Sequence, residues 1–242
     1  MIDKITYKPF GDRAILIEWP SSIDNNTLKD ILLFKEKIRS NKCIDSIDLI
    51  QGYASLTIIY KTLLTDFDRE VSLLKSIYTS FIDIKKQEYF VWEIPVCYDI
   101  SFGIDLDEIS RKKQLSISEI ITLHTQPLYT VFFIGFIPGF PYLSGLHQQL
   151  FLDRKPTPRL KVSEGAVGIG GKQTGIYPQD ISGGWNIIGK TPISFFDIKN
   201  ANPCFLKAGD FIKFNSITID EFFSIKNDAK NGKFTLKSNL HD

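Results

Sequence analysis

One stretch of this chain is dominated by glycine, and this limits what the segment can fold into. Between Gly165 and Pro192 stand eight of the sixteen glycines of the sequence. Glycine lowers helix and strand propensity alike, and it lets a backbone take positive φ or approach another group closely. Polar side chains such as Lys172 and Gln173 lie among these glycines. The pattern suits glycine-bent strands of a small barrel and, to an equal degree, a loop that holds a polar ligand.

Two nucleotide-binding motifs are superficially similar to the residues around Gly171-Lys172, and neither fits there. A P-loop needs a glycine, four residues and then Gly-Lys-Ser/Thr at the start of a helix. Here Gly171-Lys172 is followed by Gln173, and Ala166 stands where the first glycine is required. A dinucleotide fingerprint also fails, because Gln173 occupies the place of its third glycine.

Composition and length bound the class of protein. The chain has 242 residues, 43% of them hydrophobic and 24% charged, which is ordinary for a globular protein of one large or two small domains. A formal net charge of +1 provides no basic field for nucleic acid or anionic lipid. The longest apolar run, Tyr129 to Leu143, is interrupted by glycines and prolines and predicts no membrane span.

Cysteine and histidine are scarce and scattered. Three cysteines, an odd number at wide spacing, favour reduced thiols over disulfides or a redox motif. Three separate histidines argue against a zinc site. The N-terminus also lacks the apolar core of a signal peptide. We therefore expect a cytoplasmic protein without a metal site, a nucleic-acid partner or a membrane partner.

The first part of the chain predicts an α+β domain. Residues 14–19 predict a strand, and Asp24 is placed to cap a helix after it. Residues 44–60 predict two strands, and a second helix is expected over residues 66–81 with Thr65 as its cap. Strand, helix, two strands and helix is the order of an open α+β sandwich of the ferredoxin-like kind.

The rest of the chain predicts a β-rich domain. Residues 89–96 predict a strand, two short helices follow, and glycines and prolines then separate short apolar runs without an amphipathic helix. This pattern indicates an antiparallel barrel or sandwich. We expect an α+β sandwich over residues 1–86, a barrel over 87–226 and a polar C-terminal tail over 227–242, with the seam at the polar run 85–88.

His124 is expected near the end of the second short helix. Ser116 and Glu119 form a capping box at the start of that helix, and Ile117 and Ile120 share a helix face with His124. A histidine on an apolar face is more often a buried ring with one backbone partner. In the last turn, however, the ring can point into a cleft and act as an acid or base near neutral pH. Both interpretations stay open.

Two further segments have recognisable chemistry. Pro138, Phe140 and Tyr142 belong to an aromatic hinge rich in glycine and proline, which would also suit a corner of the core. Arg159 stands at the start of an expected strand, where its guanidinium could meet a carboxylate or phosphate. The commoner fate of such an arginine is a surface salt bridge.

The glycine and proline blocks form an ordered pattern that runs through nearly the whole chain. They are Gly11-Asp12, Ile94 to Tyr98, Phe102-Gly103, Leu123-His124, Phe136 to Leu143, Thr157-Pro158-Arg159, Gly168 to Pro178 and Gly183 to Pro192. Together they resemble the PxpB/KipI family, also called allophanate hydrolase subunit 1 or carboxyltransferase domain subdomain C. The resemblance implies a ferredoxin-like domain followed by a cyclophilin-like antiparallel β-barrel.

The resemblance also implies an activity. It points to the B subunit of a 5-oxoprolinase, which opens 5-oxo-L-proline to L-glutamate with ATP, together with an A subunit and a KipA-like C subunit. On this basis we expect an ATP-hydrolysing amide hydrolase that is active only as a hetero-oligomer, and which of the chains binds ATP stays open. Two alternatives remain: a KipI-like regulator that inhibits a sensor histidine kinase, or a carboxyltransferase half-domain of the urea carboxylase or allophanate hydrolase type.

Opening a lactam needs groups that stabilise an oxyanion, hold the substrate carboxylate and move protons. We expect Lys172 and Gln173, with backbone N–H groups around them, to stabilise the oxyanion, and His124 to move protons. We expect Arg159 to hold the carboxylate. The substrate site is expected to include, in addition, Pro138, Phe140, Tyr142, Gly170, Gly171, Thr174, Tyr177 and Trp185.

The chain departs from the pattern of this family in a few places. Lysine stands at 161 and 190 where the family usually has arginine, so Lys190 keeps the charge but loses the bidentate fork of a guanidinium. Ser163 and Ile181-Ser182 replace proline-containing sequences, which leaves the turn before Gly183 less rigid.

Overall fold

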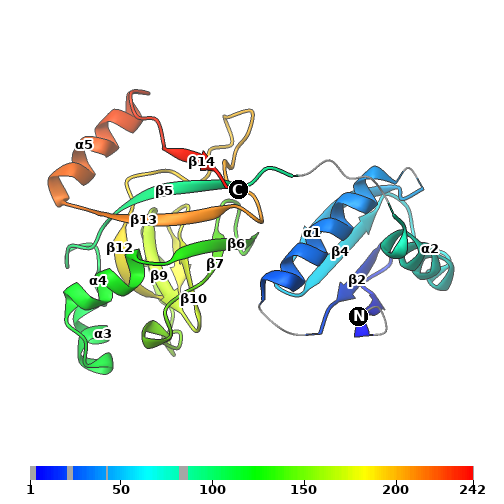
Figure 1. Ribbon diagram of the computed structural model, residues 1–242, viewed down its shortest axis with the longest axis horizontal. Helices are drawn as coiled ribbons and strands as arrows, with labels where there is room; N and C mark the ends of the chain where they lie inside the picture. Colours follow the sequence, from blue (N-terminus) through cyan, green and yellow to red (C-terminus); the bar gives the residue numbers. More distant parts are fainter. Residues whose placement is uncertain (1–3, 21–23, 42, 82–86, 242) are drawn as a thin grey trace. The chain divides into compact units, whose positions relative to one another are not determined.

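The computed structural model describes residues 4–20, 24–41, 43–81 and 87–241. The chain divides into two compact units, Met1–Gln87 and Glu88–Asp242 (Figure 1). Each unit has its own apolar core. Of the expected seam, Lys85 and Lys86 lie outside the described residues.

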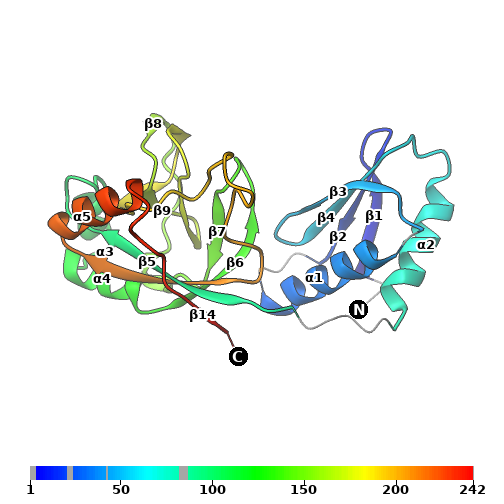
Figure 2. The same cartoon turned by 90° about the horizontal axis from the view of Figure 1, so that it is seen from above.

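The first unit is an antiparallel sheet with two helices. Its elements are β1 (Thr6–Pro9), β2 (Ala14–Glu18), α1 (Asn25–Ser40), β3 (Ser46–Gln51), β4 (Ser55–Tyr60) and α2 (Phe67–Thr79), and the sheet order is β1-β2-β4-β3. Figure 2 shows α1 running along one face of this sheet. Alternate residues of β4, Leu56 and Ile58, are buried against Ile31 and Phe34 of α1 in one cluster.

The helices of the first unit begin where their sequences provide a cap. The Asp24 carboxylate accepts hydrogen bonds from the backbone N–H groups of Asn26 and Thr27, as expected. For α2 the predicted cap Thr65 was wrong by one residue, because the Asp66 carboxylate accepts from the Arg69 N–H. Strand β1 was not predicted. It forms a hairpin with β2 and occupies the sheet edge that a strand after the second helix fills in ferredoxin-like folds.

The second unit is built on a closed barrel of seven strands. Its strands run in the order β12-β9-β10-β7-β6-β13-β5, and β12 pairs with β5 to close the ring. Their bounds are β5 (Phe90–Cys97), β6 (Leu128–Ile134), β7 (Pro141–Ser144), β9 (Ala166–Gly170), β10 (Gln173–Ile176), β12 (Asn186–Lys190) and β13 (Phe211–Ile217). All described pairs of the ring are antiparallel except β13 with β5. The predicted fold class, an α+β domain followed by a β-barrel, is confirmed.

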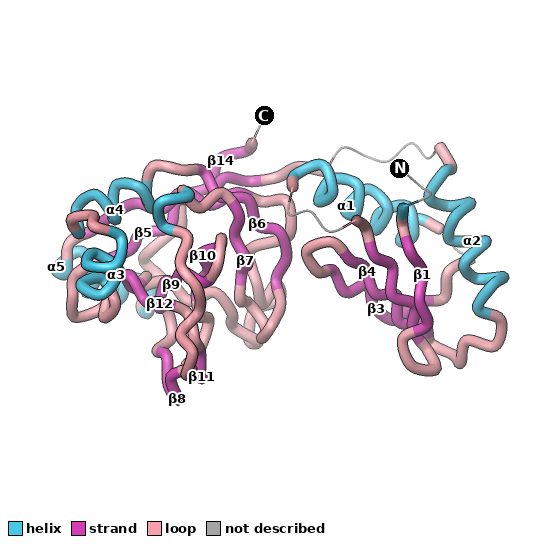
Figure 3. The backbone as a smooth tube through the Cα atoms, turned by 90° about the horizontal axis from the view of Figure 1, so that it is seen from below, coloured by secondary structure: helices cyan, strands magenta, loops and turns pink. Residues whose placement is uncertain are grey.

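Helices and a small ribbon surround the barrel. Helices α3 (Leu106–Lys113) and α4 (Ile117–Thr125) contribute Leu106, Ile109 and Ile120 to the barrel core. The predicted capping box of α4 is present in both directions. The single-turn helix η2 (Gln148–Leu150) leads toward β8 (Arg159–Val162), which pairs with β11 (Ile181–Gly183). Figure 3 shows this two-stranded ribbon projecting from the barrel.

The C-terminal segment differs from the expected polar tail. Helix α5 (Ile219–Lys230) runs past residue 227, and β14 (Ser238–Leu240) pairs with β5. Thr218 and Glu221 form a capping box, and the ring of Phe222 packs on Phe102 with 4.6 Å between centroids. The expectation was wrong because apolar packing of the first half of α5 fixes a helix whose second half is polar.

None of the helices formed by the described residues combines the length and the apolar character that crossing a membrane requires.

Candidate functional site

The first half of the glycine-rich stretch forms a hairpin of the barrel wall. Strands β9 and β10 pair with Gly170 opposite Gln173, and the turn between them consists of Gly171 and Lys172. Gly171 has φ +66°, a conformation that glycine adopts without strain. Its N–H donates to the Leu152 carbonyl at 2.7 Å, so this amide is already engaged. The expectation that the Gly171 N–H serves an oxyanion is therefore wrong.

Trp185 explains why so many glycines stand on the outer face of this hairpin. A Cβ at Gly170 would lie 2.6 Å from Trp185 Nε1, and one at Gly175 would lie 3.0 Å from Trp185 Cζ3. A Cβ at Gly168 would lie 3.2 Å from the Trp185 Cβ. Side chains at alternate positions share one face of a strand pair. The glycines thus leave a flat strip of backbone on which the indole lies, and Trp185 is only 4% exposed.

A second apolar cluster surrounds this indole, outside the barrel core. Its fully buried members include Phe140, Tyr177 and Trp185. The Phe140 ring lies edge-on to both Tyr177 and Trp185, with centroid distances of 5.2 and 5.4 Å. Tyr142 joins them at 5.8 Å from Trp185 and stacks on Phe133 at 4.4 Å. Such edge-to-face contacts fix the ring orientations.

These rings wall a cavity of about 270 Å3, which we call the aromatic cavity. Polar and charged groups converge on it from the segment between η2 and β8 and from the turn before β12. The lining residues are Phe136, Phe140, Tyr142, Arg154, Lys155, Pro158, Tyr177, Ser182, Gly183, Gly184 and Trp185. A mostly aromatic cavity with a few polar groups is the usual form of a small-molecule site.

Burial and charge set the ionisation of the tyrosines in the aromatic cavity. Burial raises the pKa of Tyr142, and the nearby positive charge of Arg154 opposes the shift. Burial also raises the pKa of Tyr177, against a hydrogen bond with the Trp185 backbone and the charge of Arg154. Both hydroxyls therefore stay protonated at neutral pH.

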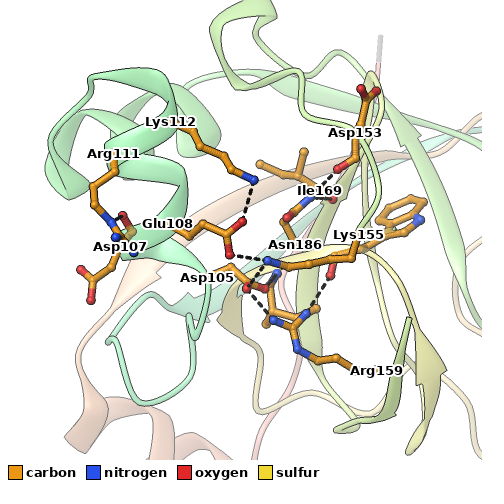
Figure 4. A network of polar contacts seen from close by, with 12 residues as sticks. Asp105, Asp107, Glu108, Arg111, Lys112, Asp153, Lys155, Arg159, Ile169 and Asn186 are labelled. Atoms are coloured by element: carbon orange, nitrogen blue, oxygen red, sulfur yellow. Dashed lines mark hydrogen bonds and ion pairs between the residues drawn. The ribbon is translucent and has the colours of Figure 1, made fainter. Parts of the chain in front are cut away.

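Arg159 does not line the aromatic cavity, because a buried carboxylate holds it. Its Nη2 donates to Asp105 Oδ1 at 2.5 Å, and its Nη1 donates to the Trp185 carbonyl at 3.4 Å. The Lys155 Nζ lies 2.9 Å from the same Asp105 oxygen and 2.5 Å from Glu108 (Figure 4). Arg159 thus serves as the partner of Asp105, and the expectation that it clamps a substrate carboxylate is wrong.

Asp105 is the centre of this network. It is 2% exposed, and its Oδ2 accepts from the Ile187 N–H at 2.6 Å while Oδ1 binds the two cations. Asn186 supports the same region by donating to the Asp153 and Ile169 carbonyls (Figure 4). The network therefore ties the start of α3 to β12 and to the chain that carries Lys155, which lines the aromatic cavity.

His124 lies inside the barrel, sealed from solvent. Its exposed fraction is 0%, and its ring stacks on Phe214 at 4.7 Å. Thr174 Oγ1 donates to the Gly168 carbonyl, so the imidazole donates from Nε2 to Thr174 at 2.9 Å. Nδ1 then accepts from the Tyr98 hydroxyl at 2.7 Å. Burial lowers the pKa of His124 to about 3. The expectation of an acid or base in a cleft is wrong. The ring is buried, as the alternative interpretation had it, but its partners are two side-chain hydroxyls and not one backbone group.

The remaining predicted residues do not line the aromatic cavity. Thr174 is fully buried in the barrel, where its hydroxyl bonds His124 and the Gly168 carbonyl, so its expected contact with substrate is wrong. Lys172 places its Nζ 6.0 Å from the centroid of the Phe151 ring. Gln173 is 8% exposed, and its amide nitrogen has no hydrogen-bond partner among the residues that the structure describes. Because Gln173 pairs with Gly170, its side chain shares the outer face with Trp185. Pro138 is exposed and lies outside the cavity lining.

The structure therefore brings together four predicted residues, Phe140, Tyr142, Tyr177 and Trp185. Sequence reasoning missed Arg154 and Lys155. A signal was present, because the run from Arg154 to Arg159 places three cations around two prolines. Over the described ranges of the chain, no three His, Cys, Asp or Glu side chains are grouped so as to hold a metal ion.

Comparisons with known proteins agree on one family. Residues 5–206 match the family model described as carboxyltransferase domain, subdomain C and D. The 5-oxoprolinase B subunit of Bacillus subtilis (strain 168) is 34% identical over 233 residues, which cover 90% of this chain and 95% of that protein. The crystal structure of TTHA0988 aligns with a TM-score of 0.73 at 32% identity, over 85% of this chain and 40% of that one.

A more distant structure supports the fold alone. The crystal structure of the Kluyveromyces lactis urea carboxylase aligns with a TM-score of 0.81 at 20% identity, over 98% of this chain. This chain spans only 24% of that protein. The same fold therefore also occurs as a part of longer chains.

Proposed function

This chain belongs to the family of carboxyltransferase domains, subdomains C and D, and from that premise we propose that it is the B subunit of an ATP-dependent 5-oxoprolinase. In this proposal it works with an A and a C subunit to open 5-oxo-L-proline to L-glutamate. The observation that carries the proposal is its similarity to 5-oxoprolinase B subunits of several bacteria along nearly their whole length.

The aromatic cavity is the proposed substrate site. Its volume of about 270 Å3 suits a small molecule. Apolar rings can enclose a five-membered lactam, and a cation of the cavity lining can meet its carboxylate. Gln173 and Lys172 do not line this cavity, and we keep them as proposed polar groups beside it, on the hairpin against which Trp185 lies. The buried amide of Gln173 lacks a partner beside Trp185 among the described residues, and a buried donor without a partner is costly unless a ligand uses it.

The proposed site needs a catalytic group from another chain to complete the reaction. Opening an amide requires a group that takes up and releases a proton near neutral pH. In the aromatic cavity the pKa values of Tyr142, Tyr177 and Lys155 are all raised, away from neutrality. His124 is sealed in the core. These features support a role for this chain inside a hetero-oligomeric hydrolase and an inactive isolated chain.

ATP is proposed to bind elsewhere in the complex. The Gly171-Lys172 pair forms the turn of an antiparallel hairpin. Gly184 to Thr191 has the residue spacing of a P-loop, but Asn186–Lys190 is strand β12 of the barrel wall, and the next helix in the described chain, α5, begins only at Ile219. A phosphate-binding loop leads instead from a strand into a helix whose N-terminus faces the phosphates. The proposed compartment is the cytoplasm, and the free thiols Cys43, Cys97 and Cys204 support it.

Reconstitution tests the proposed function. The chain is co-expressed with candidate A and C subunits from neighbouring genes, and the purified complex is assayed for glutamate formed from 5-oxoproline. We expect glutamate only when ATP and all three chains are present, and none from this chain alone. Omitting one chain at a time is the control.

Other outcomes would point to the alternative functions. A complex that copurifies, consumes ATP and forms no glutamate from 5-oxoproline contradicts the proposal. Carboxylation of urea in the presence of a biotinylated partner would identify a carboxyltransferase half-domain. Tight binding to the dimerisation helix of a sensor histidine kinase, without glutamate formation, would identify a KipI-like regulator.

A further inference from the structure

Among the described residues that line the aromatic cavity, one cation is not neutralised by a protein carboxylate. The run between η2 and β8 brings Arg154, Lys155 and Arg159 to this region. Asp105 and Glu108 pair with Lys155, and Asp105 also pairs with Arg159. Within the part of the chain that the structure describes, Arg154 makes no ion pair, yet it lines the cavity. Its charge is therefore available to a ligand.

The position of Arg154 presents its guanidinium to the cavity. The carbon of the guanidinium lies 5.7 Å from the centroid of the Trp185 ring, within the range of a cation–π contact. A contact with the face of the indole leaves the N–H edge of the fork directed to other partners. Trp185 is itself held on the glycine strip, so the guanidinium rests on a fixed support.

The field of Arg154 extends across the cavity. Its charge acts on the hydroxyls of both Tyr142 and Tyr177, which line the same cavity. Arg154 is exposed, so solvent screens part of its charge, but the buried rings on the other side of the cavity make its interaction with an anion stronger than at an open surface. An anion in the cavity would experience a single positive charge that no carboxylate compensates.

From this geometry we propose that Arg154 is the carboxylate anchor of the aromatic cavity, and that the cavity takes a small uncharged ring bearing one carboxylate. One free cation matches one carboxylate, whereas a phosphate dianion would stay half-compensated. Flat aromatic walls favour a flat ligand, and about 270 Å3 limits its size. The identification of this ligand as 5-oxoproline rests on the proposed function above.

A pair of ligands isolates the role of the carboxylate. The first is 5-oxoproline, and the second is 2-pyrrolidinone, the same lactam without the carboxylate. Their binding is followed by ligand-observed NMR with the full chain, and their inhibition or turnover is measured with the reconstituted complex. We expect Arg154→Gln to weaken binding of 5-oxoproline by about 10- to 100-fold and to leave 2-pyrrolidinone unchanged.

Two further variants complete the test. Arg154→Lys keeps the charge but loses the fork, so we expect an intermediate loss for 5-oxoproline. The matched control is Arg111→Gln, which removes another arginine whose Nε donates to a carbonyl of its own helix α3. We expect Arg111→Gln to change the affinity for neither ligand. In the complex, Arg154→Gln is expected to raise the KM for 5-oxoproline more than it lowers kcat.

The outcomes separate this inference from the proposed function. If Arg154→Gln binds 5-oxoproline as tightly as the natural chain, or weakens both lactams equally, Arg154 is not the anchor. Benzoate, a flat ring with one carboxylate and no lactam, is tested as a second carboxylate ligand. If neither 5-oxoproline nor benzoate binds saturably to the natural chain, alone or in the complex, the proposal that Arg154 anchors a carboxylate is also overturned. If carboxylates bind through Arg154 while the complex forms no glutamate, the anchor stands and the 5-oxoprolinase proposal fails.

Discussion

At the scale of single residues, the glycines of the second unit mark where one indole needs a flat support. The sequence allowed either bent strands or a ligand loop, and the structure shows that Gly168, Gly170 and Gly175 face Trp185. The density of glycines could not distinguish a packed strand pair from a ligand loop. A backbone without Cβ atoms lets either a side chain or a ligand approach closely.

A methyl group at Gly170 should therefore disturb the aromatic cavity. In Gly170→Ala the new Cβ would lie 2.6 Å from Trp185 Nε1, so the indole must move, and overpacking of this kind costs about 1–3 kcal/mol. We expect a lower midpoint of chemical unfolding and a changed near-ultraviolet circular dichroism spectrum. The matched control is Gly184→Ala, whose Cβ meets nothing closer than 3.5 Å and should be tolerated.

The buried His124 should make the second unit sensitive to acid. Its folded-state pKa of about 3 lies below its ordinary value of 6.5, so the folded state binds fewer protons between these values. The neutral His124 ring contributes fully to the free energy of unfolding above pH 6.5. This contribution, on the order of a few kcal/mol, is lost as pH falls from 6.5 toward 3. Measurement of the free energy of unfolding from pH 7 to 5 tests this sign.

The non-titrating variant His124→Gln is the control for that experiment. We expect it to be less stable at pH 7 and to show a flatter dependence on pH from 7 to 5, above the range in which the carboxylates titrate. An equally steep slope in the variant would show that another group is responsible.

The candidate site was predictable in its aromatic part and not in its charged part. Phe140, Tyr142, Tyr177 and Trp185 stand in blocks whose rings and glycines indicate a packed surface. Arg159 was assigned to the substrate because a sequence does not show which of several arginines a buried carboxylate will neutralise. Asp105 lies 54 residues before Arg159, and local patterns contain no information on that contact.

At the scale of elements, Asp105 joins α3, β12 and the chain leading to β8. We expect Asp105→Asn to lower the free energy of unfolding by about 3 kcal/mol, because Lys155 and Arg159 would lose the buried carboxylate that pairs with both. Lys155 lines the aromatic cavity, so ligand affinity should fall as well. Denaturant unfolding and ligand binding of the variant check both effects.

An exposed ion pair provides the comparison for that variant. Lys161 and Asp180 lie 2.7 Å apart between β8 and the segment before β11, and both are largely exposed. We expect Asp180→Asn to leave stability and binding almost unchanged, because solvent screens such pairs. Equal losses in the two variants would contradict a special role for the Asp105 network.

Elements with strong local signals were predicted well. The cap of α1 and the capping box of α4 agree with the structure because such hydrogen bonds form within a few residues. Helix α5 was missed although Thr218 and Glu221 form an equally good box, since its second half is polar. Strand β1 was missed because its side chains are mostly exposed, so pairing with β2 defines the strand and no apolar pattern marks it.

At the scale of the whole molecule, the two units differ in how far along the chain their contacts reach. In the first unit, β2, β3 and β4 are near neighbours in sequence, and its order of elements was predictable. In the second, β5 pairs in parallel with β13, whose partners Phe211 and Val91 stand 120 positions apart. The glycines and prolines between short apolar runs predicted a barrel. The order of its strands could not be predicted, because it depends on contacts between residues far apart in the sequence.

The place of β5 in the ring has a consequence for how the protein folds during translation. This strand is the first of the barrel to be translated, yet its neighbours β12, β13 and β14 are among the last. A nascent chain stalled after Lys199 should thus resist protease up to Thr79 while the stretch from Phe90 onward is digested. Until translation passes Ile217, β5 lacks its partner β13, and its unpaired edge could pair with another chain.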